Sequence, residues 1–402
     1  MRHALDAEGA MRNVKQLIEG LRRHSAYLDW AEDGRSPEDI KAHAEGVLVG
    51  YLSGPETLGS IPLPALAHEA VSVELLQDDP WALAMFESVL EEYRAAASVD
   101  QAASFAAIAD AEPAVLRGMS EFMSLFLMEN DKDDLGLEEL RLEAFRNIGG
   151  LVEACIKPQL QALLRQVRIR RRKATSTVDI VRLKLGTVVQ ELFDTLEVPE
   201  LVTPPPWGLS LGQWRNIAQH HDSWVEGDFV VCRYDEGSLE RTVRLTRAEL
   251  VAAIGRIHRV LGALRTARGV VVLDNIEQLR GRFEPCELRP EISLFELAVA
   301  MATQGFEVAD LVLDENAVTL SVLDVTSDSS IRRMVHASQF VVSVWQAFPR
   351  QTVVVKYLNG NGSLGVTATA TGADCEAVGS GSVPFHELAE RIRLELADGT
   401  RV

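Results

Sequence analysis

The stretch Arg215-Asn216-Ile217-Ala218-Gln219-His220 decides how the middle of the chain is interpreted. The pattern around it predicts a helix over residues 211–223. Asn216 and His220 are four residues apart and therefore share one face of that helix. Arg215 lies about 140° from His220 around the helix axis, but a long Arg side chain can curl toward the imidazole. We therefore expect Arg215, Asn216 and His220 to face one cleft.

The residues next to these three complete the expected helix. Ser210 is a suitable N-cap for it. A neighbouring stripe is expected to pack into a helical bundle: Trp214, Ile217, Ala218 and His221. His221 points about 100° away from His220 and has no third ligand nearby, so we expect a packed or supporting residue rather than a metal ligand. Asp222 could orient His220 or simply lie near the helix end, and the sequence leaves both open.

An Arg and a His in this arrangement suit phosphodiester cleavage. A guanidinium is always charged and can neutralise a phosphate, whereas an imidazole titrates near neutral pH and can move protons. The sequence contains no Walker A loop, GxGxxG, HExxH or GxSxG motif, so neither a cofactor nor a metal ion is expected.

The length of 402 residues indicates two or three domains. We expect a mainly α protein with three: an acidic all-helical domain at residues 1–135, a helical bundle with a short β-hairpin at 136–268, and a C-terminal α+β domain, an α/β sandwich, at 269–402. The net charge of −19 opposes a nucleic-acid partner, but residues 151–268 hold 18 Lys and Arg against 13 Asp and Glu. This is the one stretch where a polyanion would be tolerated.

A basic run ends the first long helical pattern of the central region. Its members could contact RNA phosphates or form a solvated helix end, and both interpretations remain open. The basic residues of the run are Arg168, Arg170, Arg171, Arg172 and Lys173.

Composition indicates a soluble globular protein, with 47% hydrophobic and 25% charged residues. No apolar run approaches about 18 residues, and the N-terminus lacks the apolar core of a signal peptide, so we expect a cytoplasmic protein without a membrane partner. The four cysteines are far apart and form no CxxC, which predicts reduced, buried thiols: Cys155, Cys232, Cys286 and Cys375.

Local signals predict most of the elements. Helix starts are expected at Ser36-Pro37, Asp79-Pro80 and Glu112-Pro113. One amphipathic pattern over 138–164 contains Pro158, which would kink or split a helix. The remaining expected elements are a helix over 178–196, a hairpin around 236–238, a Thr246-capped helix over 247–268, a β-rich region from 270–273, helices over 293–305, 331–348 and 384–397, a strand over 318–325, and a hairpin around 359–362.

Over residues 138–268 the chain resembles the HEPN superfamily. Arg215 to His220 is similar to its Arg-polar-x(3–5)-His signature, and the segments 148–154, 157–160 and 245–250 fit the helices on either side. These small helical bundles include many metal-independent RNases of toxin and phage-defence systems. Members silenced by nucleotidylation carry a Tyr two residues after the His, where this chain has Asp222. That difference argues against this mode of control.

The resemblance implies a reaction and roles for the three residues. Arg and His from two protomers would line a shared cleft, in which the ribose 2′-OH attacks the adjacent phosphate and leaves a cyclic phosphate and a 5′-hydroxyl. Arg215 would stabilise the transition state, His220 would transfer a proton, and Asn216 would orient the His or the phosphate. The chain would thus be a homodimeric endoribonuclease acting on RNA, with a defence or antitoxin partner. The alternative is a catalytically silent HEPN module that dimerises or regulates within a defence or stress complex.

Overall fold

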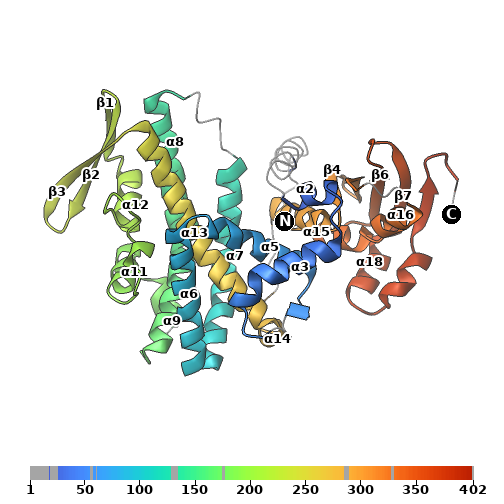
Figure 1. Ribbon diagram of the computed structural model, residues 1–402, viewed down its shortest axis with the longest axis horizontal. Coiled ribbons are helices and arrows are strands. Elements are labelled where there is room, and N and C mark those ends of the chain that lie inside the picture. Colours follow the sequence, from blue (N-terminus) through green and yellow to red (C-terminus); the bar gives the residue numbers. More distant parts are fainter. Residues whose placement is uncertain are drawn as a thin grey trace. The chain divides into compact units, whose positions relative to one another are not determined.

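The computed structural model describes residues 18, 26–54, 58–59, 61–127, 135–173, 177–284, 289–326 and 330–400. The chain divides into two compact units, coloured along the sequence in Figure 1. The bundle unit comprises Val47–Ile61 and Glu69–Glu287, and the sheet unit comprises Met1–Gly46, Pro62–His68 and Leu288–Val402. This grouping differs from the expected division into three domains, because residues 69–127 belong to the same unit as the segment that carries Arg215 and His220.

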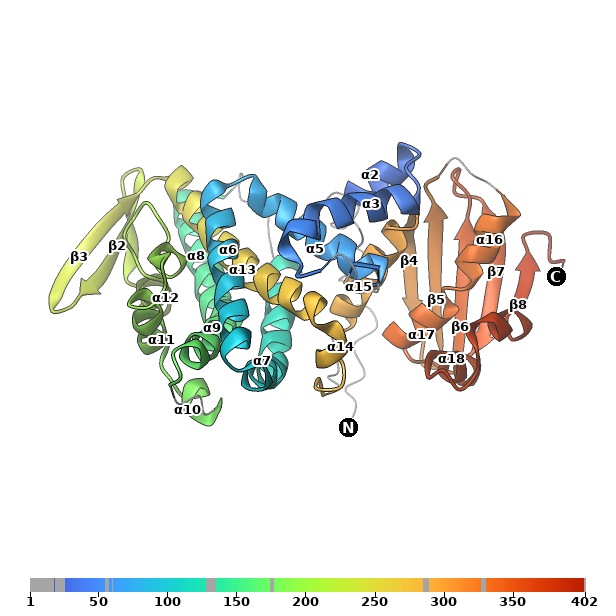
Figure 2. The same ribbon diagram turned by 60° about the horizontal axis from the view of Figure 1, so that its bottom comes forward.

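Five long helices form the core of the bundle unit. They are α6 (Pro80–Val99), α7 (Gln101–Leu127), α8 (Leu137–Gly150), α9 (Lys157–Arg170) and α13 (Arg247–Asp274). As predicted, α6 begins at Asp79-Pro80, where the Asp79 carboxylate accepts a hydrogen bond from the Trp81 N–H. Helix α13 packs against both α6 and α8 (Figure 2).

A π-helical turn, Leu151–Ile156, joins α8 to α9. Pro158 follows it at the start of α9 and has no N–H to donate, so the disturbed hydrogen bonding lies at the position where the sequence predicted a kink. Helix α7 approaches this turn closely at Gly118, because a Cβ there would lie 2.7 Å from the Ala154 carbonyl oxygen. The Cys155 thiol also donates to the Gly118 carbonyl oxygen at 3.2 Å.

The rest of the bundle unit surrounds the predicted site. Two short helices, α10 (Thr177–Val181) and α11 (Leu185–Phe193), lead to α12 (Leu211–His220). The three-stranded antiparallel sheet β1 (Ser223–Glu226), β2 (Phe229–Glu236) and β3 (Leu239–Leu245) follows. The predicted hairpin is therefore present, longer than expected and joined by a third strand. Short helices Val49–Tyr51, Pro199–Leu201 and α14 (Ile276–Leu279) complete the unit.

The sheet unit contains a five-stranded sheet in sequence order, β4 (Phe306–Leu313), β5 (Ala317–Asp324), β6 (Thr352–Leu358), β7 (Leu364–Thr371) and β8 (Arg393–Leu396). Only β5 and β6 pair in parallel. Helices α16 (Ile331–Ser338) and α17 (Val341–Ala347) form that crossover and pack on β6 and β7 (Figure 2). Its other helices are α2 (Ala26–Glu32), α3 (Pro37–Leu48), α15 (Pro290–Ala302), α18 (Gly372–Gly379) and the 3-10 helix Phe385–Glu390, while α5 (Leu63–Gln77) spans the unit boundary.

Five predicted elements are wrong or displaced. The expected helix over 178–196 is divided into α10 and α11. Val270–Leu273 is the end of helix α13 rather than a strand, because this apolar run is buried among helices. Pro113 lies inside α7 and starts no helix. The expected helix over 331–348 is divided into α16 and α17, and the one over 384–397 is replaced by a 3-10 helix and strand β8.

Candidate functional site

Helix α12 is fixed at its start by a capping box. The Ser210 hydroxyl accepts from the Gln213 N–H at 3.2 Å, and the Gln213 side chain accepts from the Ser210 N–H at 2.8 Å. Gln213 also donates to the Asp235 carbonyl oxygen of β2 at 2.9 Å, which ties the helix to the sheet. Trp214 and Ile217 are buried, as predicted, and hold the opposite face of the helix in the bundle.

Arg215 is held by a carboxylate that the sequence reasoning did not identify. Its Nε lies 3.1 Å from Glu153 Oε2, and its side chain is 22% exposed. Its Nη1 donates to the Asn216 side-chain oxygen at 3.1 Å. The other Glu153 oxygen accepts from Lys157, so the carboxylate lies between two cations. Glu153 is part of the π-helical turn Leu151–Ile156, a kind of turn that is frequent at functional sites.

Asn216 and His220 are both exposed on α12. Their spacing of four residues within the helix places them on one face, as the sequence predicted. The structure therefore presents an imidazole, an amide and a half-buried guanidinium on the same short helix. Asn216 lies between Arg215 and His220: its side-chain oxygen accepts a hydrogen bond from Arg215, and His220 follows one helical turn later.

His221 does not pack into the bundle, so that part of its prediction is wrong. Helix α12 ends at His220, not at residue 223, and His221 adopts a left-handed conformation with φ of 56°. Its N–H caps the helix by donating to the Ile217 carbonyl oxygen, and its side chain is exposed rather than packed. A non-glycine residue in this region of the Ramachandran plot is uncommon.

Asp222 faces Arg233 of β2. One Asp222 carboxylate oxygen accepts from Arg233 Nη2 at 2.6 Å, and the Asp222 carbonyl oxygen accepts from the Arg233 N–H at 2.8 Å. Of the two roles considered for Asp222, this pairing favours the structural one, in which it connects the helix end to the sheet. The hydrogen bond that Arg233 donates to Asp222 raises the pKa of Arg233, so this side chain keeps its charge.

The basic run at the end of α9 is largely paired with protein groups. Arg168 donates to Glu191 through Nε at 3.0 Å and Nη2 at 2.6 Å, and these bonds lower the pKa of Glu191. Arg170 lies 3.1 Å from the buried Glu92. Arg171 donates to the Thr195 carbonyl oxygen at 3.3 Å. These contacts favour the solvated helix end over phosphate recognition.

Arg172 and Lys173 are exposed beyond the helix end, and Arg172 has a φ of 54°. An open depression of about 560 Å³ adjoins the run and is lined by Arg171, Lys173, Gly186, Thr187, Gln190, Glu191, Asp194 and Thr195. Its two carboxylates balance its two cations, so it is not an anion site of the kind a phosphate requires.

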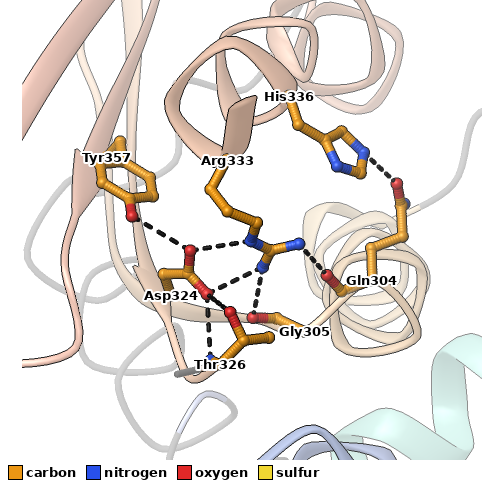
Figure 3. Close-up of polar contacts among 7 residues, drawn as sticks. All are labelled: Gln304, Gly305, Asp324, Thr326, Arg333, His336 and Tyr357. Carbon is orange, nitrogen blue, oxygen red and sulfur yellow. Dashed lines mark hydrogen bonds and ion pairs between the residues drawn. The ribbon is translucent and has the colours of Figure 1, made fainter. Parts of the chain in front are cut away.

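A second polar cluster lies in the sheet unit (Figure 3). Arg333 donates to both Asp324 oxygens at 2.8 Å and to the Gln304 and Gly305 carbonyl oxygens at 2.9 and 3.0 Å. Burial would raise the pKa of Asp324, but its hydrogen bonds from Arg333 and Thr326 outweigh that effect and lower it. Arg333 is the centre of a buried ion pair.

His336 adjoins this cluster through Gln304. Its Nε2 lies 2.6 Å from the Gln304 side-chain oxygen, and its ring packs edge-on against Phe306 at 5.4 Å between centroids. Burial, followed by the nearby Arg333 charge, lowers the pKa of His336. His336 therefore stays neutral near pH 7 and packs as a structural residue.

The cysteines that the structure describes are buried and unpaired with one another. Burial raises the pKa of Cys155 and Cys232 to about 12 and that of Cys375 to about 11, so these thiols stay protonated and are weak nucleophiles. Cys286 lies outside the described residues. In the described part of the chain, no group of three or more His, Cys, Asp or Glu side chains could hold a metal ion, and no helix is long and apolar enough to cross a membrane.

Comparisons of the chain with family models, curated proteins and solved structures gave no match.

Proposed function

We propose that this protein is a metal-independent endoribonuclease of a toxin or anti-phage defence type, active as a homodimer. The observation that supports this proposal is the arrangement on α12, where exposed Asn216 and His220 share a face and Asn216 is bonded to Arg215. These side chains supply the charge neutralisation and proton transfer that cleavage of an RNA phosphodiester needs. The resemblance to HEPN RNases supplies the reaction class.

The reaction is an internal transesterification. The ribose 2′-oxygen loses its proton to a base and forms a bond to phosphorus, while the bond from phosphorus to the 5′-oxygen breaks and that oxygen takes a proton. His220 of one protomer serves one proton transfer, and the same residue of the second protomer serves the other. Arg215 stabilises the additional negative charge on the phosphate oxygens. The products are a 2′,3′-cyclic phosphate and a 5′-hydroxyl end.

Glu153 sets a condition on this chemistry. Arg215 is engaged by the Glu153 carboxylate at 3.1 Å, so an incoming phosphate competes with Glu153 for the guanidinium. The exchange is feasible because 34% of the Glu153 side chain is exposed and Lys157 remains beside the carboxylate as its counter-ion. A phosphodiester carries one negative charge, as a carboxylate does, but the transition state of the cleavage carries a second, so the guanidinium is attracted most strongly as the reaction proceeds.

Cleavage of total RNA in EDTA tests the proposal. Wild-type protein is expected to give fragments with 5′-hydroxyl ends, and expression of it should arrest growth. Arg215→Ala and His220→Ala should each lower cleavage by about a hundredfold or more, the range for losing one proton donor or one charge-stabilising group. Gln219→Ala is the matched control, since Gln219 is an exposed neighbour on α12. Intact RNA with wild-type protein, or full cleavage by His220→Ala, would refute the nuclease.

One observation favours a second candidate function, a catalytically silent dimerisation or regulatory module. In the Arg215–Glu153–Lys157 cluster, Glu153 offsets one of the two positive charges that a phosphate would meet. Under this alternative, Arg215→Ala and His220→Ala change neither RNA integrity nor growth, while dimerisation persists in both variants.

A further inference from the structure

Strand β3 is an edge strand with a self-complementary sequence. The three-stranded sheet has the order β1-β2-β3, so among the described strands β3 pairs only with β2. All but two of its residues, Val243 and Leu245, are exposed, and Leu239 near the turn is 55% exposed. The opposite edge differs, because Arg141 of α8 donates to the Ser223 carbonyl oxygen of β1 at 3.1 Å. An unprotected edge strand is a template for pairing with another strand.

The register of the hairpin shows which backbone groups face this edge. Glu236 pairs with Leu239 across a two-residue turn, in which Gly237 has a φ of 64°. Such a turn closes on a hydrogen-bonded pair, and bonded and non-bonded pairs then alternate along the strands. Residues 239, 241, 243 and 245 therefore bond toward β2. Glu240, Thr242 and Arg244 direct their N–H and C=O groups away from it.

The side chains of these outward-bonding residues match a second copy of the same strand. With two β3 strands antiparallel and centred on Thr242, Glu240 of one copy lies opposite Arg244 of the other, and the same pair repeats by symmetry. Leu239 then lies opposite Leu245, and Thr242 opposite its own copy. Centring the pairing on residue 240 or 244 would instead set like charges opposite each other, which is unfavourable.

We propose that β3 is a homodimerisation edge, which joins the two three-stranded sheets into one continuous antiparallel sheet. The interface is isologous, as a twofold dimer requires. Arg244 is available for exchange because its present pair with Glu226, at 3.0 Å, is formed between exposed side chains. Glu240 is held less firmly, since its distance to Arg233 Nε is 3.9 Å. Exposed pairs of this kind contribute little, so they exchange easily.

The pairing leaves α12 away from the joined edge. Gln213 of α12 donates to the Asp235 carbonyl oxygen of β2, which by the alternation above faces away from β3. Both β3 strands would therefore lie between the two copies of α12, and the β3 pairing is independent of the proposed RNase function.

Charge exchange across the two copies tests the pairing. Glu240→Arg sets Arg opposite Arg244, and Arg244→Glu sets Glu opposite Glu240, so each variant alone is expected to lose the dimer. A mixture of the two single variants should form a heterodimer, and the double variant should regain the homodimer. Arg241→Glu, an equal change of charge on the same strand, is the control that should stay dimeric. Sedimentation velocity and native mass spectrometry of the full chain give the readout.

A second variant tests the hydrogen bonds between the backbones of the two β3 strands. Thr242→Pro removes an outward N–H without removing a bond to β2, so it should weaken the dimer and leave the hairpin in place. Thermal melts of each variant show that the fold is retained. A wild-type chain that is monomeric at submillimolar concentration, single reversals that remain dimeric, or a mixture that stays monomeric would each overturn the proposal. All are measured without RNA, so they are independent of whether the protein cleaves it.

Discussion

At the scale of single residues, the site depends on which partner each cation has. Arg215, Arg168, Arg170 and Arg333 all lie within ion-pair distance of a carboxylate. Residue type and spacing gave the positions of Arg215 and His220 on α12. They could not give Glu153, because its side chain reaches Arg215 from a different helix through a π-helical turn. Ion-pair partners that tertiary packing brings from another helix cannot be predicted from the spacing of residues along the sequence.

Glu153 offers a direct prediction at this scale. Glu153→Gln keeps the shape of the side chain and removes the charge that competes with phosphate for Arg215. Because the pair is partly exposed, we expect a modest gain of about 0.2–1 kcal/mol in RNA binding, or up to about fivefold in affinity. Fluorescence anisotropy with a short RNA measures it. The control is Glu143→Gln, which breaks the surface pair of Glu143 with Arg146 and should leave RNA affinity unchanged. Weaker RNA binding by Glu153→Gln would contradict the prediction and show that Glu153 positions Arg215 instead.

At the scale of elements, capping and turn signals correctly predicted the helix starts and the hairpin that depend on local sequence alone. The capping boxes at Ser210 and Thr246 and the hairpin between β6 and β7 are present where expected. Elements that depend on their surroundings were missed. The run Val270–Leu273 has the composition of a strand, yet it extends α13 because neighbouring helices bury it. Strand β8 is only four residues long and exists through its pairing with β7.

The contact of α7 with the π-helical turn gives a prediction for an element. Gly118→Ala would place a Cβ 2.7 Å from the Ala154 carbonyl oxygen, so backbone must shift. We expect a loss of about 1–3 kcal/mol in the free energy of unfolding, as in other overpacked interiors. Gly255→Ala in α13 is the control, since no atom lies within 4 Å of its added Cβ. That variant should gain about 0.4–1 kcal/mol. Chemical denaturation measures both, and equal stability gains would contradict the close approach.

At the scale of the whole molecule, the two units are built differently from the sequence. The bundle unit is drawn almost entirely from one stretch, 69–287, whereas the sheet unit combines segments from before and after it. Composition and charge had suggested boundaries near residues 135 and 268. Those boundaries followed changes in charge and periodicity, whereas compact units follow the burial of apolar side chains.

This organisation predicts how fragments behave. A fragment of residues 47–287 contains the bundle core, including buried Phe86, Tyr93 and Trp214, and should unfold in one cooperative transition. A fragment of residues 288–402 lacks α2, which packs on α15 in the full chain, and should show no cooperative transition. Circular dichroism during heating distinguishes them. A non-cooperative 47–287 fragment would contradict the division into these two units.

The interrupted sheet unit has a consequence for the order of events during synthesis. A ribosome releases the chain from its N-terminus, and domains fold as their residues emerge. Residues 26–46 leave before the bundle, yet the strands and helix α15 of their unit emerge only after it. The bundle, with α12 and its Arg215 and His220, can thus be complete while the early helices still lack their partners. During synthesis, the helix proposed to cut RNA can therefore be folded before the strands of the sheet unit have been made.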